Sequence, residues 1–150
     1  VFESEAETMA AIRAGQIVPG DVVVVRNVGP VGGPGMPEMV MLTIQLQGRG
    51  LGEDVALITD GRFSGVSHGI LIGHISPEAA RGGPIAAVRE GDTIVIDPVA
   101  RTLNLEVSPE EIARRLADWR AATVPRQVRP GSVHDKYIRL VSSAHYGCVV

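Results

Sequence analysis

The sequence predicts a β-rich α/β domain, closer to a barrel or sandwich with flanking helices than to a doubly wound sheet. Three observations support this prediction. More segments have the pattern of a strand than of a helix, the connections are short, and many connections are rich in glycine. The chain has 150 residues, which is the length of a single domain, and only 3% are aromatic. We therefore expect one core built mainly from Val, Ile, Leu and Ala.

The N-terminal segments predict a capped helix and then a buried strand. Ser4 and Glu7 form the pattern S-x-x-E, a capping box in which each side chain accepts from the other residue's amide, and Gly15 ends the helix. Residues 22–26 (VVVVR) are apolar on both faces, which is typical of a central strand. Residues 29–39 hold four glycines and three prolines, a composition that excludes a helix or a paired strand.

The middle of the chain alternates between helical and strand patterns. Residues 39–50 favour a helix that ends at Gly48 or Gly50. Residues 55–59 and 70–75 have the β-branched, apolar composition of strands. A short helix is expected to begin at residues 76–78, with Pro at its first position, and to end at residues 82–83.

The C-terminal third predicts a hairpin and two helices. Residues 93–97 and 103–107 have the composition of strands and are joined by a short connection, so we expect a hairpin. Apolar and polar side chains alternate over 103–107, which predicts one face exposed to solvent. A second capping box, S-P-E-E at 108–111, opens a helix with apolar residues at 112, 116 and 119. Residues 123–135 indicate a loop, and residues 136–144 favour a last helix.

Composition and charge exclude several classes of function. The net charge of −3 argues against a protein that binds nucleic acid, which needs a basic face. No apolar run approaches the roughly 18 residues of a membrane span, and the acidic N-terminus is unlike a signal peptide. A lone Cys148 can form no internal disulfide, so a cytoplasmic location is expected. Val1 stands where a start Met is usual, which indicates either a piece of a longer protein or a processed start.

The loop 29–39 delivers one carboxylate, Glu38. The loop lacks the third glycine of a dinucleotide fingerprint and has no Gly-Lys-Ser/Thr, so we reject it as a phosphate loop. Its prolines stiffen the backbone and its glycines allow close approach to a ligand. Glu38 is therefore either a ligand of a hard cation, which accepts carboxylate oxygen, or an exposed glutamate after a rigid loop.

The segment ITDGRFSG (58–65) runs from a strand into a loop that holds Arg62 and Ser64. Ser64 lacks the flanking glycines of a nucleophile elbow, so it is either a turn residue or a serine with another chemical role. A triad of Ser64, His68 and Asp60 is conceivable, but nothing in the spacing orders it. Arg62 could hold a substrate carboxylate or pair with a surface acid. The four histidines lack a compact metal-binding spacing.

Three long stretches together resemble one enzyme family. They are GPVGGPGMPEM (29–39), ALITDGRFSGVSHGILIGHISPEAARGGPIAAVREGDTIVID (56–97) and KYIRLVSSA (136–144). In this order they resemble the C-terminal domain of the dihydroxy-acid, phosphogluconate and sugar-acid dehydratases, and the resemblance covers almost the whole chain. The residues of the GRFSG and GHISPEAA motifs resemble the dihydroxy-acid branch more than the other two branches.

The resemblance implies a reaction and two site residues. The reaction removes water from a 2,3-dihydroxy acid to give a 2-oxo acid, in the synthesis of valine and isoleucine. The serine of the DGRFSG motif, here Ser64, is implied as the base that takes the C2 proton. The glutamate of the GPGMPE motif, here Glu38, is implied as a ligand of magnesium. Arg62 is a weaker candidate for binding the substrate.

The resemblance also implies what lies outside this chain. The family carries an iron–sulfur cluster, and its cysteine ligands and the other magnesium ligands lie in an N-terminal domain with no counterpart here. The fold implied is a swivelling, barrel-like domain that closes over that N-terminal domain of the same enzyme. The full-length protein is expected to be a homodimer, and this chain alone is expected to be inactive.

Three alternatives stay open at this point. The chain could be a stand-alone small subunit or binding module of the same fold. It could belong to the sugar-acid or phosphogluconate branch, which predicts a basic pocket near Ser64. Arg62 and Arg81 would provide little positive charge for such a pocket. It could also be a structural or regulatory domain, in which case removal of the Ser64 hydroxyl would be silent.

Overall fold

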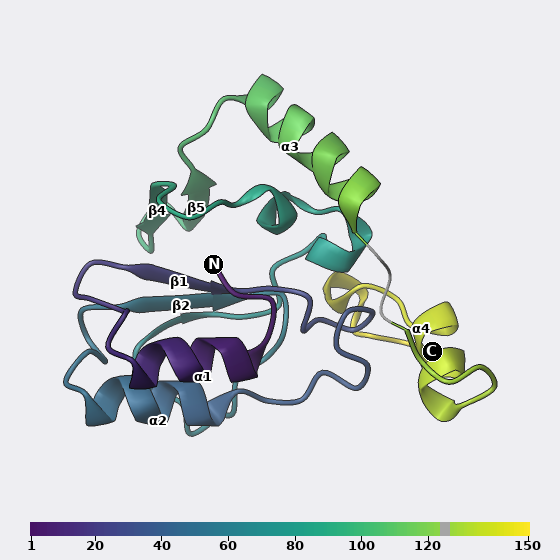
Figure 1. Cartoon of the computed structure of the whole chain (residues 1–150), viewed down its shortest axis with the longest axis horizontal. Coiled ribbons are helices and arrows are strands. Elements are labelled where there is room, and N and C mark those ends of the chain that lie inside the picture. The colour runs from purple at the N-terminus through teal and green to yellow at the C-terminus, as the bar shows by residue number, and fades with distance from the viewer. Residues whose placement is uncertain (124–126) are drawn as a thin grey trace.

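The computed structural model, which describes residues 1–123 and 127–150, has a small parallel sheet with other elements packed on both of its faces (Figure 1). Helices α1 and α2 cover one face, and two 3-10 helices, a hairpin and α3 lie over the other. The elements in chain order are α1 (Glu5–Arg13), β1 (Val22–Val25), α2 (Val40–Gly48), β2 (Ala56–Thr59), β3 (Ile70–Ile72), the 3-10 helices Ala79–Arg81 and Pro84–Ala87, β4 (Ile94–Asp97), β5 (Thr102–Leu105), α3 (Pro109–Ala122), α4 (Val133–Leu140) and the 3-10 helix Ala144–Tyr146.

The sheet has the order β1-β2-β3, and all of its pairs are parallel. The central strand is β2, which pairs with both β1 and β3, and every one of its residues is buried. The prediction that β1 is central was wrong, because β1 lies at one side of the sheet. Its outer edge pairs with Phe2, whose amide donates to the Val24 carbonyl over 2.8 Å. Apolar side chains on both faces of a strand indicate that other elements pack above and below the sheet. They do not indicate whether the strand lies at the centre or at the side of the sheet.

The core consists of two apolar clusters separated by the sheet. The first lies between the sheet and helices α1 and α2, and contains Ile12, Val23, Val25, Leu42, Leu46 and Leu57. The second lies under the hairpin and α3, and contains Val24, Ile58, Ile85 and Val88. Successive strand residues therefore serve opposite clusters, as the two-residue period of a strand requires.

Serine caps open α1, α3 and α4, whereas α2 has no side-chain cap from the described residues. The hydroxyls of Ser4, Ser108 and Ser132 each accept from a backbone amide three residues later, over 3.2 Å in each case. The first capping box is only half formed, since the Glu7 carboxylate accepts from the amide of Glu3 and not from that of Ser4. A single serine hydroxyl is enough to satisfy one orphan amide of each helix.

Several predicted boundaries are confirmed and others move. The hairpin and the helices predicted at 39–50 and from the cap at 108 onward are confirmed, whereas the strand predicted at 70–75 ends at Ile72. Pro77 precedes the 3-10 helix Ala79–Arg81 and does not stand inside it. The last helix begins at Val133, because Ser132 caps it, and ends at Leu140, before the extended Val141. The loop predicted at 123–135 is thus shorter at its end, and residues 124–126 lie outside the described residues.

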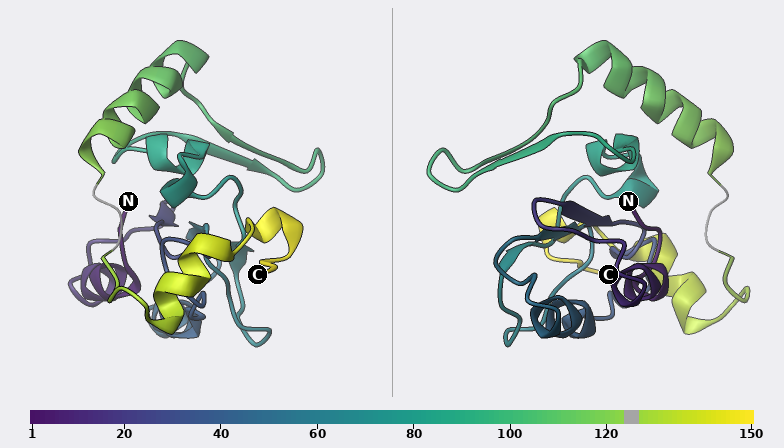
Figure 2. Two further views of the ribbon diagram at one scale, coloured as in Figure 1. Left: turned by 90° about the vertical axis from the view of Figure 1, so that its right-hand side faces the viewer. Right: turned by 60° about the vertical axis from the view of Figure 1, so that its left-hand side comes forward.

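The mixed α/β class is confirmed, but the finer architecture is not. In the described part of the chain, the parallel sheet and the antiparallel hairpin β4–β5 are separate, and together they form no closed barrel. The hairpin projects from the body of the molecule (Figure 2). The α-helices also hold more residues than the strands do within the described ranges, so the domain is less rich in β-structure than its sequence predicts.

Candidate functional site

The loops that follow β1, β2 and β3 begin at the same edge of the sheet, where all three strands end (Figure 1). These loops are residues 26–39, 60–69 and 73–78, and they include Glu38, Arg62 and Ser64. In open parallel sheets, ligands bind beyond the carboxyl ends of the strands, because the loops there converge. This edge is therefore the candidate site.

Asp60 holds the three loops together. Its side chain is fully buried, and its carboxylate accepts from the amides of Val28 (3.0 Å), Asn27 (3.1 Å) and Ala79 (3.0 Å). Burial raises the pKa of Asp60 above its usual value, and the hydrogen bonds from backbone amides counteract part of this rise. One side chain thus links the end of β2 to the chain after β1 and the chain after β3.

The segment after Asp60 has little freedom to move. The Thr59 hydroxyl accepts from the Gly61 amide over 2.9 Å, and a Cβ at Gly61 would lie 2.8 Å from Val28 Cγ2. A contact that short requires glycine at this position. Phe63 then packs against the cluster under α1 and α2. The aromatic ring anchors the loop, and its neighbours Arg62 and Ser64 remain accessible to solvent.

Glu38 and Arg62 are joined although they are 24 residues apart, since their backbones form an isolated parallel bridge. The Met39 amide donates to the Arg62 carbonyl over 3.3 Å, and Arg62 Nε donates to the Met36 carbonyl over 2.6 Å. The Arg62 and Glu38 side chains are 44% and 42% exposed, and their charged groups are 3.8 Å apart. The structure therefore brings the loop of Glu38 alongside the loop of Ser64.

Ser64 is half-buried and stands two residues beyond this bridge. Its hydroxyl accepts from the Val66 amide over 3.4 Å, and its carbonyl accepts from the Ser67 amide, as in a turn. The geometry gives no support to a triad with His68, because both Asp60 oxygens are occupied by backbone amides. The Ser64 hydroxyl is free to donate its own proton or to accept another.

The residues present could supply one carboxylate ligand to magnesium, but they include too few cysteines to hold an iron–sulfur cluster. Among the described residues, no group of three His, Cys, Asp or Glu side chains is placed to hold a metal ion. Glu38 has an exposed carboxylate with a long ion pair as its contact, which fits one ligand position of a hard cation. Cys148 is the single cysteine of the chain, and burial raises the pKa of its thiol. A cluster held by several thiolates does not fit this chain.

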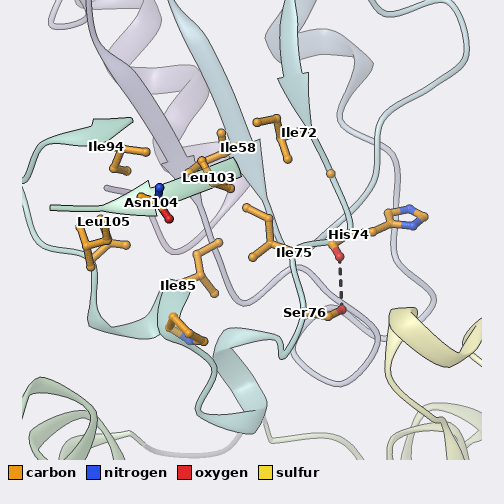
Figure 3. Close-up of a pocket in the computed structure, with 13 residues that line it drawn as sticks. Ile58, Ile72, His74, Ile75, Ser76, Ile85, Ile94, Leu103, Asn104 and Leu105 are labelled. Atoms are coloured by element: carbon orange, nitrogen blue, oxygen red, sulfur yellow. Dashed lines mark hydrogen bonds between the residues drawn. The ribbon is translucent and has the colours of Figure 1, made fainter. Parts of the chain in front are cut away.

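A separate apolar cavity of about 430 Å³ lies between the sheet and the hairpin (Figure 3). Isoleucine and leucine side chains dominate its wall, and the Ser76 hydroxyl, which donates to the His74 carbonyl over 3.2 Å, is one of its few polar groups. Glu38, Arg62 and Ser64 do not line it. The candidate site is thus the loop edge and not this cavity.

The comparisons with known proteins agree with the loop motifs. Residues 1–148 match the family described as Dihydroxy-acid/6-phosphogluconate dehydratase C-terminal. The chain belongs to this family. Curated relatives named dihydroxy-acid dehydratase include proteins of Francisella tularensis subsp. novicida (53% identity), Chloroflexus aggregans (56%) and a Synechococcus species (57%). Each alignment covers 99% of this chain but only 26% of the relative, so the chain spans about a quarter of their length.

In the described residues, no helix combines the length and the apolar character needed to cross a bilayer.

Sequence reasoning placed Glu38, Arg62 and Ser64 in neighbouring loops but missed two buried acids that organise them. Asp60 was considered only as a member of a triad, and Glu78 only as an acid in the first turn of the short helix expected from residue 76. The signal for Asp60 was its place directly after a fully apolar strand, where a carboxylate faces amides and not water. Glu78 carried no comparable signal, because its partners lie 65 and 66 residues further along the chain.

Proposed function

We propose that this chain is the C-terminal part of a dihydroxy-acid dehydratase, which removes water from a 2,3-dihydroxy acid to give a 2-oxo acid. The observation that carries the proposal is the bridge between Glu38 and Arg62 beside Ser64, at the carboxyl edge of the sheet. Relatives over 50% identical to this chain are named for that activity. The loops that hold these residues are fixed by the buried Asp60 and by Gly61.

Ser64 is proposed as the base of the elimination. The C2 proton passes to the Ser64 oxygen, the electron pair of the C2–H bond forms a C2–C3 double bond, and the C3–O bond breaks as hydroxide leaves. The resulting enol then gains a proton at C3 and loses the proton of its C2 hydroxyl, and becomes the 2-oxo acid. A serine can accept this proton only where positive charge stabilises its alkoxide, because the free hydroxyl is a very weak acid.

Glu38 is proposed as one ligand of magnesium. When bound, magnesium supplies positive charge that acidifies the C2 proton and favours the ionised serine. The Glu38 carboxylate is free for this role, since its 3.8 Å contact with Arg62 is longer than a hydrogen-bonded ion pair. The other ligands, and the group that takes the leaving hydroxide, are expected on the remainder of the parent protein.

Arg62 is proposed to bind the substrate carboxylate. Its Nε is occupied by the Met36 carbonyl, which fixes the plane of the guanidinium. The terminal nitrogens remain accessible, with the side chain 44% exposed. A guanidinium whose plane is fixed in this way matches the two oxygens of a carboxylate.

The supply of positive charge favours a substrate without phosphate. Arg81 is the second cation that a phosphate pocket near Ser64 could use, but its NH2 donates to the Val141 carbonyl over 2.6 Å. Its Nε also faces the buried Glu78 at 3.8 Å. This observation supports a dihydroxy acid over 6-phosphogluconate.

The finer architecture belongs to the same proposal. Because the chain spans about a quarter of its relatives, we infer an N-terminal domain of the same enzyme as its partner, over which this domain closes as a swivelling lid. The full-length enzyme is proposed to be a cytoplasmic homodimer with magnesium and an iron–sulfur cluster. The chain alone is expected to give no turnover of 2,3-dihydroxyisovalerate, because one carboxylate and one serine do not make a complete site.

Kinetics of the full-length parent protein test this proposal. Ser64→Ala is expected to lower kcat for 2,3-dihydroxyisovalerate by about 10²–10⁴-fold, which is the contribution of a positioned base. Arg62→Gln is expected to act mainly on KM. Ser108→Ala is the matched control, because it removes a serine from a helix cap far from the loops. Full turnover in Ser64→Ala, or faster turnover of 6-phosphogluconate by the unmodified protein, would contradict the proposal.

A further inference from the structure

Glu78 is an almost fully buried carboxylate that binds the end of the chain. Its side chain is 1% exposed, and Oε1 accepts from the Ala144 amide (2.7 Å) and from the Ser143 hydroxyl (2.8 Å). Oε2 is also buried and receives no hydrogen bond from the residues that the structure describes, while Arg81 Nε lies 3.8 Å away. A carboxylate is costly to bury unless its partners are firmly placed. The partners here come from one short segment near the C-terminus.

That segment is a closed turn, formed by residues 142–149, which we call the C-terminal turn. The Ser142 amide donates to the Val149 carbonyl, and the Val149 amide donates to the Ser142 hydroxyl, each over 2.8 Å. Because its two ends are tied together, the turn moves as one unit. It contacts the loop 29–39 through the Cys148 sulfur, which lies 3.5 Å from the sulfur of Met36.

Met36 connects the C-terminal turn to the candidate site. Its side chain is buried and meets the turn, while its carbonyl accepts from Arg62 Nε over 2.6 Å. Glu38 follows two residues later and forms the bridge with Arg62. The backbone from which Glu38 projects is therefore supported on one side by Arg62 and on the other by the C-terminal turn.

We propose that Glu78 is a positioning residue of the dehydratase site. By holding the C-terminal turn against Met36, Glu78 fixes the stretch of backbone that carries Glu38 and receives Arg62. Glu78 contacts neither of those side chains in any bond described above, so it acts through the turn. The expected effect of Glu78 on catalysis rests on the proposed function. The structural link between Glu78 and the loop 29–39 rests only on the contacts described above.

The chemistry of the contact predicts how substitutions differ. Glu78→Gln keeps an oxygen that can accept from both Ser143 and Ala144, so it is expected to preserve the link. Glu78→Ala leaves a buried amide and a hydroxyl without their acceptor, and is expected to release the turn. Ser143→Ala removes one of the two bonds and is expected to lie between them.

The first experiment is amide hydrogen exchange in the full-length parent protein. Glu78→Ala is expected to accelerate exchange by about 10-fold or more in peptides covering both 33–39 and 142–149, since local opening follows the loss of local bonds. Glu78→Gln should stay close to the unmodified protein, and Glu53→Ala, an exposed glutamate, is the matched control. Faster exchange confined to 142–149 would overturn the proposal. If Glu78→Ala does not fold, Ser143→Ala decides in the same two peptides.

The second experiment reads the site in the same full-length variants. Displacement of Glu38 is expected to raise the magnesium concentration for half-maximal activity by about 10-fold in Glu78→Ala, as loss of a supporting contact does at other metal sites. The value of kcat/KM is expected to fall by about 10²-fold, and Glu78→Gln should recover most of both. A lower Tm with unchanged magnesium dependence and kcat/KM would show a merely structural role. If Ser64→Ala is also silent, the proposed function fails, and the exchange result still decides the structural link.

Discussion

Replacement of Asp60 by Asn tests whether buried hydrogen-bond acceptors, and not packing, hold the site loops together. Asp60 Oδ2 accepts from Asn27 and Ala79, and Oδ1 accepts from Val28. Asparagine has nearly the same size and shape, but one of its terminal atoms is an NH2 group that donates. In either orientation of the amide, at least one backbone N–H loses its acceptor and faces another donor.

The magnitude follows from the number of amides left unpaired. Each buried donor without a partner costs about 1–3 kcal/mol, so Asp60→Asn, which leaves at least one amide unpaired, is expected to cost at least about 1–3 kcal/mol. Asp60→Ala, which leaves three unpaired, is expected to cost about 3–9 kcal/mol. These are large fractions of the roughly 5–15 kcal/mol that stabilises a domain of this size. Desolvation raises the pKa of Asp60, so burial of its charge is unfavourable by itself. Removal of the carboxylate is nevertheless expected to destabilise the chain, because the buried amides that donate to it lose their acceptor.

Urea unfolding of the chain at constant pH measures both values, with the slope of the transition compared between variants. Asp54→Asn is the matched control, because Asp54 is exposed and lies six residues earlier in the same segment. Its effect is expected to stay within about 0.5 kcal/mol. If Asp60→Asn destabilises the chain by less than about 1 kcal/mol, the amide-acceptor account is refuted and packing alone places the loops.

Two further predictions concern the loop after β2 and the start of α3. Gly61→Ala is expected to cost about 1–3 kcal/mol by overpacking, because the new Cβ would lie 2.8 Å from Val28 Cγ2. Gly65→Ala, which meets nothing within 4 Å, should be nearly silent in the same urea series, and equal effects would contradict the steric argument. Hydrogen bonds from Arg114 and Arg115 lower the pKa of Glu111 from 4.5 to about 2, so its contribution is present above pH 4.5 and lost as pH falls toward 2. Glu111→Gln should therefore flatten the fall of Tm across that window, and an unchanged slope would exclude the role.

The sequence carried enough local information to predict most elements. Ser4, Ser108 and the glycine-rich loop 29–39 are short-range signals, and each marks a boundary that the structure shows. Some errors arise where a distant contact decides, as in the place of β1 at the side of the sheet beside β2. Others arise from a local signal that was missed. The last helix begins at Val133 because the Ser132 hydroxyl caps it, although the apolar pattern predicted a later start.

The candidate site was predictable only in part for the same reason. The sequence motifs singled out Glu38, Arg62 and Ser64. In the structure, the bridge between Glu38 and Arg62 places their loops side by side. The roles of these residues stay predictions until the variants are measured. Asp60 was visible in the sequence but was assigned no role in the fold, because one sequence does not show which amides a carboxylate will meet.

The three site loops are connected by side chains that bind backbone, and this arrangement has a consequence for substitutions. Asp60 binds amides of two other loops, Arg62 binds the Met36 carbonyl, and Glu78 binds the Ala144 amide. Backbone partners are present whatever residue occupies the partner position, so each link depends on one side chain alone. A change that preserves size but reverses donor and acceptor at Asp60 should therefore harm the site more than a change of side chain at Asn27 or Ala79, whose amides survive any substitution except proline.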